Sequence, residues 1–405
     1  MHVLFADALA SGAVDRLRSG GHDVTVAPEH DADSLVGVLD DVDALVVRST
    51  RVTSAALESS ARLALVVRAG AGTENIDTAT ASARGVHVCN VPGRNAVAVA
   101  ELTMGLLLAI DRHIADGAAD LRAGRWNKKR YADADGLLGS TIAIVGLGDI
   151  GLRVAERAKA FGMRVVGQRR EGRSDAVEAS IRQIGIRLFD SLADVLGAAD
   201  IVSIHVPFTD DTRGMVDAAF LSHLRDGAIL LNTSRGDIVD EAALIDALDT
   251  RGIRAGLDVY AGEPASGQGA FASALASHPS VVGTHHIGAS TRQAQTSVAD
   301  GVVEVIEAFV AGNPLHCINL APHGVGAHSI AVRHLDRVGV LAGVLGVLRR
   351  NGLNVEHMEN RVFEGLVAAV ATIEVAGTVP DGLVGQLAAV DGVLGVTLVE
   401  AAARP

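Results

Sequence analysis

Short apolar segments alternate with helical stretches in two successive series along the chain. The first series comprises HVLFADA, DVTVA, ALVVRST, LALVVRAG and GVHVCNVP. The second series restarts after Ser140 and comprises TIAIVGLG, MRVVGQ, GIRLF, IVSIHVP, AILLNTS, AGLDVY and VVGTHHIG. Strands that alternate with helices form parallel sheets covered by helices on both faces. The sequence therefore predicts two doubly wound, parallel-sheet α/β domains in tandem.

Two helical segments are expected to connect these domains. The first runs from Asn95 to Gly124 without a proline, and it is apolar on several faces, which favours a subunit interface in a homodimer or homotetramer. The second, TRQAQTSVADGVVEVIEAFVAG, follows the last strand of the second series and is expected to return the chain to the first domain. We therefore expect a discontinuous first domain, residues 1–95 with 288–315, and a second domain over residues 96–287.

A smaller region follows the two series. The segment from Asn313 to Ala327 is rich in Pro, Gly and His and is typical of a linker. Beyond it, apolar and helical segments follow in the order strand, helix, strand, strand, helix, strand. This order predicts a small α+β domain over residues 326–405.

Composition narrows the classes of function. A formal net charge of -13 disfavours a nucleic-acid binder and is typical of a soluble metabolic protein. No run of about 18 apolar residues occurs and the N-terminus lacks a signal pattern, so we expect a cytoplasmic protein without a membrane partner. Cys89 and Cys317 are too few for a disulfide framework or a zinc site, so we expect reduced thiols and no metal.

A glycine loop opens the second series. Gly146, Gly148 and Gly151 fit the spacing G-x-G-x-x-G, directly after a strand and before a helix. The first glycine permits a tight turn, the second lets the backbone approach a pyrophosphate, and the third lets helix and strand pack closely. With Asp149 and Ile150, this loop predicts that a dinucleotide binds at the helix N-terminus of the second domain.

The strand after the glycine loop bears on which dinucleotide is bound. In such units this strand normally ends in an acidic residue that binds the adenosine ribose, but here it ends in Gln168, Arg169 and Arg170. A guanidinium at this place pairs with a 2′-phosphate, so the site favours NADP(H), or both cofactors, over strict NAD(H). The alternatives are a solvated strand end with the ribose held by Gln168, or Glu171 turned into the site.

Reactive side chains follow three strands of the second domain. Arg235, Glu263 and His286 lie in NTSRGDIVD, LDVYAGEP and HHIGAS, at the carboxyl ends that line the ligand crevice of a doubly wound sheet. An arginine clamps a substrate carboxylate, a histidine exchanges a hydroxyl proton, and a carboxylate behind the histidine fixes its tautomer. These residues predict an oxidoreductase acting on a hydroxy acid. The plainer alternative is a surface ion pair and two capping histidines.

The segments resemble those of the D-isomer-specific 2-hydroxyacid dehydrogenase family over about residues 40 to 315. The matching motifs are VRST, VRAGAGTENID, NVPGRNAVAVAELT, GRWNKK, IVGLGDIG, HVPFTDDTRGMV, NTSRGDIVDEAAL, LDVYAGEP and HHIGAST. The resemblance implies that the first domain binds substrate and the second, Rossmann-like domain binds the cofactor.

The resemblance also implies roles for single residues. Arg235 would bind the substrate carboxylate and keto oxygen, Glu263 would support the histidine, and His286 would be the acid/base. Asp258 would hold the nicotinamide carboxamide. Further implied cofactor contacts are His205, Val206, Pro207, Thr212, Thr233, Ser234 and Gly288. His285 stands where the family usually has proline, and we expect it to shape the loop, with a second proton carrier as the alternative.

Within this family the chain resembles the D-3-phosphoglycerate dehydrogenases. Arg48 and Arg68 end strands of the first domain and are expected to bind a substrate phosphate. Lys128 stands where that group carries a basic residue reaching the neighbouring subunit's site. Further expected substrate contacts, besides Arg235 and His286, are Ser49, Ala71, Gly72 and Asn95. The first hypothesis is interconversion of 3-phosphoglycerate and 3-phosphohydroxypyruvate, the first step of serine biosynthesis.

Two other functions stay open from the sequence. Because cellular NADPH favours reduction, a site built around Arg169 suits a reductase of hydroxypyruvate, glyoxylate or a phosphono-2-oxo acid. The other is a non-catalytic, cofactor-sensing protein on the same scaffold. It is disfavoured because such proteins commonly lose the catalytic residues, whereas Arg235, Glu263 and His286 are all present.

The C-terminal region resembles an ACT regulatory domain, which in this family binds serine or another amino acid at a domain–domain interface. His334, Asp336 and Asn354 occupy the matching effector positions. Asp336 replaces the usual Asn and Val338 the usual Pro, and the added negative charge would pair with an amino group yet disfavour a nearby carboxylate. The alternative to an effector site is a purely structural, dimerising sheet.

Overall fold

The computed structural model of the protein describes residues 1–264, 269–321 and 328–400. The chain divides into two compact units, residues 1–319 and residues 320–405. Within the described ranges, every helix is too short or too polar to span a bilayer.

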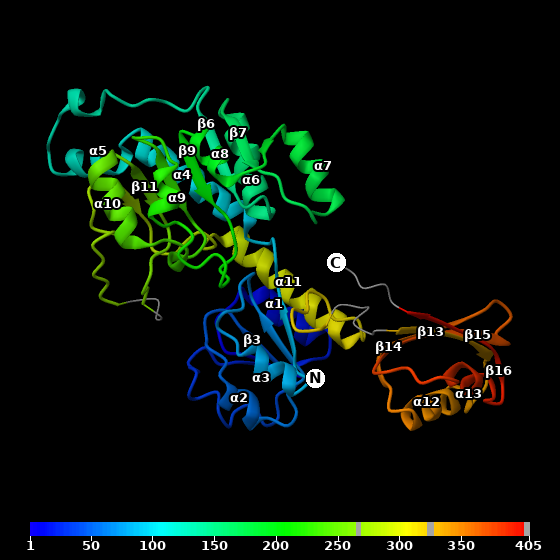
Figure 1. The fold of residues 1–405 in the computed structure, drawn as a ribbon. Helices are drawn as coiled ribbons and strands as arrows, with labels where there is room; N and C mark the ends of the chain where they lie inside the picture. Colours follow the sequence, from blue (N-terminus) through cyan, green and yellow to red (C-terminus); the bar gives the residue numbers. More distant parts are fainter. Residues whose placement is uncertain (265–268, 322–327, 401–405) are drawn as a thin grey trace. The chain divides into compact units, whose positions relative to one another are not determined.

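The first lobe of the larger unit is a five-stranded parallel sheet in the order β2-β1-β3-β4-β5 (Figure 1). Its strands are β1 (His2–Phe5), β2 (Asp23–Val26), β3 (Ala44–Val47), β4 (Leu65–Arg68) and β5 (His87–Asn90). Its helices are α1 (Ser11–Ser19), α2 (Ser54–Ser59), α3 (Thr78–Ala83) and α11 (Arg292–Val310). β3 is buried along its whole length, as expected of a parallel strand covered on both faces. α11 packs against α1, β4 and β5, so a helix from near the end of the larger unit completes this five-stranded lobe.

The second lobe is a seven-stranded parallel sheet in the order β12-β11-β10-β9-β6-β7-β8. Its strands are β6 (Thr141–Val145), β7 (Arg164–Gln168), β8 (Arg187–Phe189), β9 (Ile201–Ile204), β10 (Ile229–Asn232), β11 (Arg254–Leu257) and β12 (Val281–Gly283). Its helices are α4 (Ala96–Asp111), α5 (Ile114–Arg122), α6 (Asp149–Ala160), α7 (Asp175–Ile184), α8 (Leu192–Gly197), α9 (Ala218–Ser222) and α10 (Glu241–Arg251), with 3-10 turns η1 (Lys128–Tyr131) and η2 (Gly236–Ile238). The strand order reverses between β6 and β9, where doubly wound sheets form their ligand crevice. Every strand segment predicted in the two series forms a strand, which confirms the α/β fold class.

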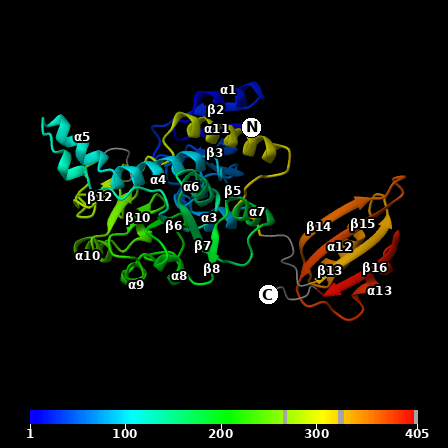
Figure 2. The same ribbon diagram turned by 90° about the horizontal axis from the view of Figure 1, so that it is seen from above.

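The helical segment predicted from Asn95 to Gly124 is two helices in the structure. α4 ends at Asp111 and α5 begins at Ile114, and His113 between them has a left-handed φ of 50°. The buried Asp111 carboxylate accepts a hydrogen bond from the N–H of Gly136 (3.0 Å), which ties the end of α4 to the returning chain. Most of α4 is buried against α6, β10, β11 and β12 (Figure 2). Its apolar faces are therefore mostly covered within the chain and do not by themselves indicate a subunit interface.

Part of the predicted linker joins the five-stranded sheet. The N–H of Asn90 in β5 donates to the carbonyl of His316 (3.2 Å), and the N–H of Ile318 donates to the carbonyl of Val88 (2.8 Å). β5 is an edge strand, and its free backbone groups can pair with a segment that runs alongside. The rest of the predicted linker, residues 322–327, lies outside the described residues.

The smaller unit is a four-stranded antiparallel sheet in the order β14-β15-β13-β16. Its elements are β13 (His328–Leu335), α12 (Val340–Arg350), β14 (Asn354–Val362), β15 (Ala368–Ala376), α13 (Leu383–Ala388) and β16 (Val393–Glu400). Residues of β15 alternate between buried and half-buried, so one face packs on the helices. The predicted order of strands and helices is confirmed.

Candidate active site

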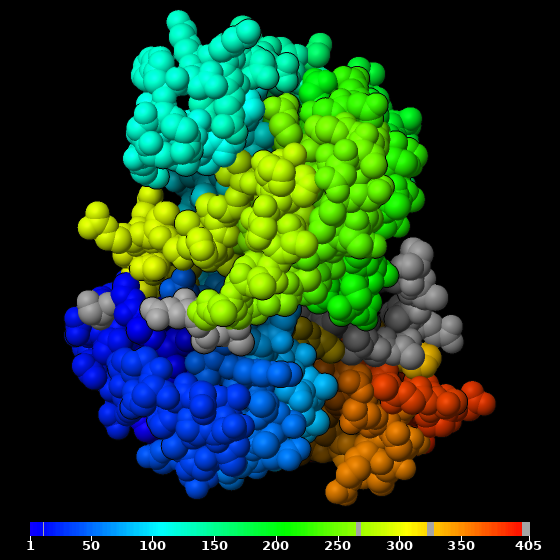
Figure 3. Space-filling view, turned by 90° about the vertical axis from the view of Figure 1, so that its left-hand side faces the viewer, coloured from blue at the N-terminus to red at the C-terminus, as the bar shows by residue number. Residues whose placement is uncertain are grey.

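A cavity of about 960 Å³ opens between the two lobes of the larger unit. In the space-filling view of Figure 3 the blue five-stranded lobe borders the green seven-stranded lobe. Most of the site residues predicted from the sequence line this cavity: Arg48, Ser49, Arg68, Ala71, Gly72, Asn95, Gly148, Asp149, Ile150, His205, Val206, Pro207, Thr233, Ser234, Arg235, Asp258, Glu263, His286 and Gly288. Those outside its lining are Lys128, Gly146, Gly151, Gln168, Arg169, Arg170 and Thr212. The carboxyl ends of both sheets thus contribute to one cavity.

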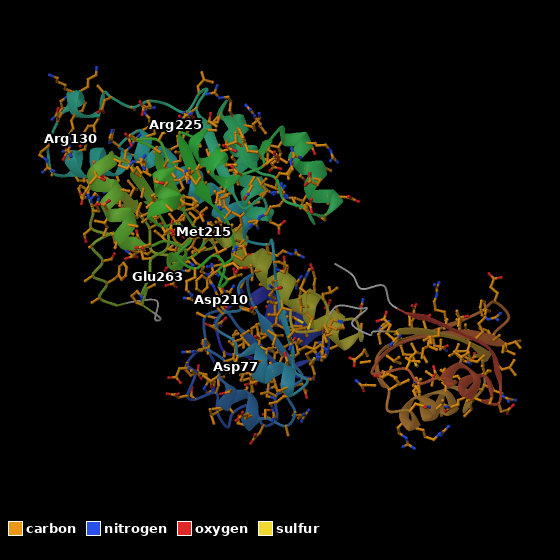
Figure 4. The ribbon with its side chains drawn as sticks, in the orientation of Figure 1. Asp77, Arg130, Asp210, Met215, Arg225 and Glu263 are labelled. Carbon is orange, nitrogen blue, oxygen red and sulfur yellow. The ribbon has the colours of Figure 1, made fainter. Side chains whose placement is uncertain are left out.

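His286 and Glu263 form a hydrogen-bonded pair in this cavity. Nδ1 of His286 lies 2.7 Å from Oε2 of Glu263, and Oε1 of Glu263 accepts a hydrogen bond from the N–H of Tyr260 (2.9 Å). Burial alone would raise the pKa of Glu263, but these hydrogen bonds and the positive charges of His286 and Arg235 lower it below its usual value. Glu263 is therefore ionised at neutral pH, so Nδ1 of His286 is the donor in this hydrogen bond. Nε2 is then the ring nitrogen available to a substrate oxygen. Figure 4 shows Glu263 on the side of its lobe nearest the five-stranded lobe.

Asp258 holds the loop that carries His286. Its buried carboxylate accepts a hydrogen bond from the Thr284 hydroxyl (2.5 Å). It also accepts hydrogen bonds from the N–H groups of Ile287 (2.9 Å) and Gly288 (2.8 Å). The His286 N–H donates to the Asp258 carbonyl (2.8 Å), and His286 adopts a left-handed φ of 52° that a non-glycine residue keeps only when its surroundings impose it. A nicotinamide carboxamide at this carboxylate would share it with three donors of the loop.

Arg235 reaches the cavity from the turn after β10. The Asn232 amide donates to the carbonyl of Arg235 (2.9 Å), and its oxygen accepts a hydrogen bond from the N–H of Ser234 (3.0 Å). Gly236 follows, and a Cβ there would lie 2.0 Å from the backbone carbonyl carbon of Tyr260. Glycine therefore lets this turn pack against the segment between Asp258 and Glu263, which brings arginine, carboxylate and histidine to one place.

Glu74 is a cavity residue that the sequence did not predict. It lies in the loop after β4, and its Oε1 is 3.4 Å from Nε of Arg235 in the other lobe. The side chains are 45% and 34% exposed, so the pair lies at a partly solvated place. The only sequence signal is an acidic residue after a strand end, in GAGTEN, which is common in loops. The group expected to bind the substrate carboxylate thus already has a carboxylate partner.

A second unpredicted residue, Asp7, orders the loop after β3. Its Oδ2 accepts hydrogen bonds from the N–H groups of Arg48 (2.7 Å), Ser49 (3.1 Å) and Thr50 (3.0 Å), and Oδ1 accepts one from the Ser49 hydroxyl (2.8 Å). Burial would raise the pKa of Asp7, but these hydrogen bonds lower it. β1 and β3 are neighbours in the sheet, so Asp7 at the end of β1 is placed to fix the backbone that carries Arg48.

Arg68 contributes an incompletely satisfied guanidinium to the cavity. It folds over the backbone of Gly70, where a Cβ would lie 1.5 Å from one terminal nitrogen of Arg68. Its Nε is buried and has no hydrogen-bond partner among the described residues. Burial, together with the positive charges of Arg235 and Arg48, lowers the pKa of Arg68 to about 10. A buried donor beside other cations favours an anionic ligand.

The glycine loop has a geometry that fits a dinucleotide. Gly146 has φ 103°, and a Cβ there would lie 2.5 Å from the carbonyl oxygen of His205. A Cβ at Gly151 would lie 2.0 Å from the carbonyl oxygen of Gly146, so α6 packs closely on the turn. A Cβ at Gly148 would meet no atom within 4 Å, so the space beside this residue is open. Gly148 lines the cavity at the N-terminus of α6. A pyrophosphate fits there, in front of the free N–H groups of the helix.

His205 follows β9 at the edge of the cavity. Its Nε2 lies 2.7 Å from Oγ of Ser203, and its Nδ1 is buried without a hydrogen-bond partner among the described residues. Burial lowers the pKa of His205 to about 3, so the ring is neutral at physiological pH. Thr212 does not line the cavity but donates to the carbonyl of Pro207 (2.7 Å), so it holds the loop that follows His205.

The predicted 2′-phosphate site has an acidic neighbour. Arg169 follows β7, and its Nε donates to Oδ1 of Asp190, the residue after β8 (3.0 Å). The strand itself lacks the usual terminal carboxylate, but β8 pairs with β7 and brings the carboxylate of Asp190 alongside. Both side chains are well exposed, at 63% and 90%, so the pair contributes about 0–1 kcal/mol and can exchange for a phosphate.

Lys128 does not join the cavity of its own chain. It is exposed in η1, in the segment after α5. In Figure 4, Arg130 of the same turn and Glu263 lie on opposite sides of the seven-stranded lobe, with Glu263 on the side toward the five-stranded lobe. Lys128 is therefore not part of the cavity that its own chain forms.

Comparisons with known proteins identify the family. Residues 104–288 match the D-isomer specific 2-hydroxyacid dehydrogenase, NAD binding domain. The chain is also 38% identical over 287 residues to a hydroxypyruvate reductase of Thermotoga maritima, covering 70% of this chain and 90% of that protein. The chain belongs to the D-isomer-specific 2-hydroxyacid dehydrogenase family.

Other members of the family are similarly related. A D-3-phosphoglycerate dehydrogenase of Methanocaldococcus jannaschii is 36% identical over 330 residues, which cover 80% of this chain and 61% of that protein. The chain therefore spans about three-fifths of the length of that relative. The crystal structure of an NADPH-dependent glyoxylate/hydroxypyruvate reductase from Sinorhizobium meliloti matches with a TM-score of 0.68 and 29% identity, over 78% of this chain and 97% of that one.

The three predicted effector residues are not gathered in one copy of the smaller unit. His334 is buried, with Nε2 3.0 Å from Oδ1 of Asn360, and Asp336 is exposed just beyond β13. His334 pairs across the sheet with Ala369, whereas Asn354 pairs with Ala376 at the other end of β15. A site that contains all three residues would therefore need two copies of the domain.

Proposed function

We propose that the protein is a nicotinamide-dependent oxidoreductase that interconverts a D-2-hydroxy acid and its 2-oxo acid. The observation that carries this proposal is the His286–Glu263 pair, in one cavity with Arg235 and with the glycine-loop helix N-terminus. Family membership supports it, since relatives are named as dehydrogenases and reductases of this substrate class.

Each residue has a distinct part in the proposed reaction. Arg235 binds the substrate carboxylate and orients the carbon that carries the oxygen. Nε2 of His286 accepts the hydroxyl proton during oxidation and returns it to the carbonyl oxygen during reduction, while Glu263 stabilises the imidazolium. The cofactor, when bound, accepts or donates the hydride. Gly148 and the N–H groups at the start of α6 would hold its pyrophosphate.

The preferred substrate pair is 3-phosphoglycerate and 3-phosphohydroxypyruvate, the first step of serine biosynthesis. Arg48 and the unsatisfied Nε of Arg68 supply cations in the same cavity as Arg235, so a substrate with two anionic ends fits better than one with a single carboxylate. Several relatives are named D-3-phosphoglycerate dehydrogenase, which agrees with this assignment.

A second candidate is an NADPH-dependent reductase of hydroxypyruvate, glyoxylate or a phosphono-2-oxo acid. It is favoured by the exposed Arg169, which can release Asp190 and pair with a 2′-phosphate. Because of Arg169 we propose a preference for NADP(H) in either reaction. Relatives named hydroxypyruvate reductase and NADPH-dependent glyoxylate/hydroxypyruvate reductase agree with this alternative.

We also propose a homodimer or homotetramer in which Lys128 contributes to the partner's cavity. The support is that α5 and the segment after it, which includes Lys128 in η1, expose several large apolar side chains: Ile114 (54% exposed), Leu121 (60%), Trp126 (82%) and Leu138 (86%). Exposed apolar side chains in one segment are a feature of many interfaces. In the ACT-like unit, an amino-acid effector would lie between His334 and Asp336 of one copy and Asn354 of another.

A substrate panel tests the proposal directly. The full chain is assayed with 2-oxo acids, phosphorylated and plain, using NADH and NADPH in parallel. We expect turnover that is abolished by His286→Ala and retained by His285→Ala, because His286 is the one of these two histidines that forms a hydrogen bond with Glu263 among the described residues. Turnover that survives His286→Ala would overturn the proposed mechanism, and the order of substrates separates the two candidates.

A further inference from the structure

The two cysteines of the chain, Cys89 and Cys317, lie directly opposite each other. Cys89 is in the edge strand β5 and is fully buried, at 0% exposure. Cys317 is half-buried in the short segment that pairs with β5 after α11. Residues distant in sequence are therefore brought into register at the end of the larger unit.

The backbone hydrogen bonds define how the two cysteines face each other. The residues that flank them exchange hydrogen bonds, from Asn90 N–H to His316 O (3.2 Å) and from Ile318 N–H to Val88 O (2.8 Å). The two cysteines exchange none between their own backbones, so they form a non-hydrogen-bonded antiparallel pair. In such a pair the Cα atoms are about 4.5 Å apart and the side chains share one face. A disulfide needs a Cα separation of about 4.4–6.8 Å, and the separation expected for such a pair lies at the lower end of this range.

The two thiols differ in access. Burial raises the pKa of Cys89 to about 12, with a further contribution from its hydrogen bond to Cys317. The thiol of Cys317 donates to Oδ1 of Asn319 (3.2 Å), and Asn319 also accepts a hydrogen bond from the N–H of Val88 (2.8 Å). Cys317 is therefore the thiol that is accessible to a reagent in solution, and Cys89 is the buried thiol opposite it.

We propose that Cys89 and Cys317 are a dithiol–disulfide site that reacts with a low-molecular-weight disulfide. The thiolate of Cys317 attacks the external disulfide, forms a mixed disulfide and releases one small thiol. The sulfur of Cys89 then loses its proton to solvent and attacks the Cys317 sulfur, which forms the protein disulfide and releases the second small thiol. Two protein thiols are oxidised and one external disulfide is reduced to two thiols, so electrons and protons balance.

A disulfide between Cys89 and Cys317 would join the segment at the end of the larger unit covalently to β5. Without it, this segment is held to β5 by the two main-chain hydrogen bonds and by Asn319. With it, the segment is covalently joined to the strand that leads into the cavity-lining residues Pro92 and Gly93. Oxidation would therefore keep residues 316–318 paired with β5 and prevent this segment from separating from the strand.

Reaction with oxidised glutathione tests this site in the full, folded chain. The reduced wild type is incubated with oxidised glutathione, and intact mass and non-reducing peptide maps are recorded. We expect a mass loss of two hydrogens, a cross-linked peptide pair containing Cys89 and Cys317, no retained glutathione, and reversal by dithiothreitol. Hydrogen exchange at the Ile318 amide should slow by about tenfold or more after oxidation, because the segment can no longer open freely.

The single-cysteine variants make the result decisive. Cys89→Ser should retain glutathione on Cys317, because no second thiol resolves the mixed disulfide. Cys317→Ser should stay unmodified, because the remaining thiol is buried. A wild type that stays reduced, that keeps glutathione on Cys317, or that forms only links between chains would overturn the proposal. Because no readout involves substrate turnover, the outcome does not depend on the proposed enzymatic function.

Discussion

Replacing Glu263 with Gln separates the charge of this residue from its shape. In the structure, Nδ1 of His286 and Oε2 of Glu263 are 2.7 Å apart, which sets the two charge centres at about 4 Å. At that distance the attraction is about 1 kcal/mol with the screening of water and about 4 kcal/mol at an effective dielectric constant of about 20. The side chains are 50% and 28% exposed, so the lower part of this range applies, about 1.4 kcal/mol or tenfold.

The sign of the effect follows from which form of His286 reacts. Reduction of a 2-oxo acid needs the protonated ring, and Glu263 favours that form. In Glu263→Gln we expect kcat/KM for reduction to fall by about tenfold, because the variant no longer stabilises the imidazolium. The measurement is kcat/KM at neutral pH with saturating cofactor, for wild type and variant.

A neighbouring carboxylate supplies the control. Glu241 accepts a hydrogen bond from the N–H of Ala261 (3.0 Å) and so supports the same loop. Glu241→Gln should therefore leave kcat/KM for reduction nearly unchanged. If Glu241→Gln lowers kcat/KM as much as Glu263→Gln does, Glu263 acts only by supporting the loop, and the electrostatic argument is wrong.

Four further outcomes follow from the site. Gly151→Ala should destabilise the protein by about 1–3 kcal/mol in urea unfolding, whereas Gly148→Ala should leave stability within about 0.5 kcal/mol and raise the KM for cofactor. Arg68→Ala should raise the KM for phosphorylated substrates about tenfold or more and that for hydroxypyruvate much less; equal effects would refute phosphate binding. Arg169→Ala should lower kcat/KM for NADPH about tenfold and spare NADH, and a loss with NADH instead would contradict the 2′-phosphate assignment. His205 has a pKa of about 3 in the folded protein and about 6.5 in the unfolded chain, so the unfolded chain binds a proton first as the pH falls. The free energy of unfolding should therefore be unaffected by His205 above about pH 6.5 and lower by about 2 kcal/mol at pH 5. His205→Gln should reduce this pH dependence, measured by urea unfolding at several pH values.

The features predicted from sequence are those with strong local signals. Buried parallel strands such as ALVV and LVVR read as continuous apolar runs, and the glycine spacing of GLGDIG has one well-defined geometry. The order of the segments then placed Arg235, Glu263 and His286 at the same edge of a sheet. These residues do line one cavity in the structure.

The features that escaped prediction depend on contacts between distant residues. The break at His113 accompanies a hydrogen bond from Gly136 to Asp111, which no helical periodicity contains. Glu74 is recognised as a site residue only through its ion pair with Arg235, a residue of the other lobe. The pairing of residues 316–319 with β5 was hidden by a composition typical of a linker. In each case, the local sequence allows several conformations and a tertiary contact selects one.

In the proposed reaction, the contact between Glu74 and Arg235 makes the binding of a substrate carboxylate a competition with an anion of the protein itself. A compound with a single weak charge would therefore gain less from Arg235 than the arginine alone could give. A ligand with a well-placed carboxylate and a second negative group recovers that loss through the other arginines. The cavity would then distinguish between metabolites because each must compete with Glu74 for Arg235, and this competition lowers the affinity for all of them.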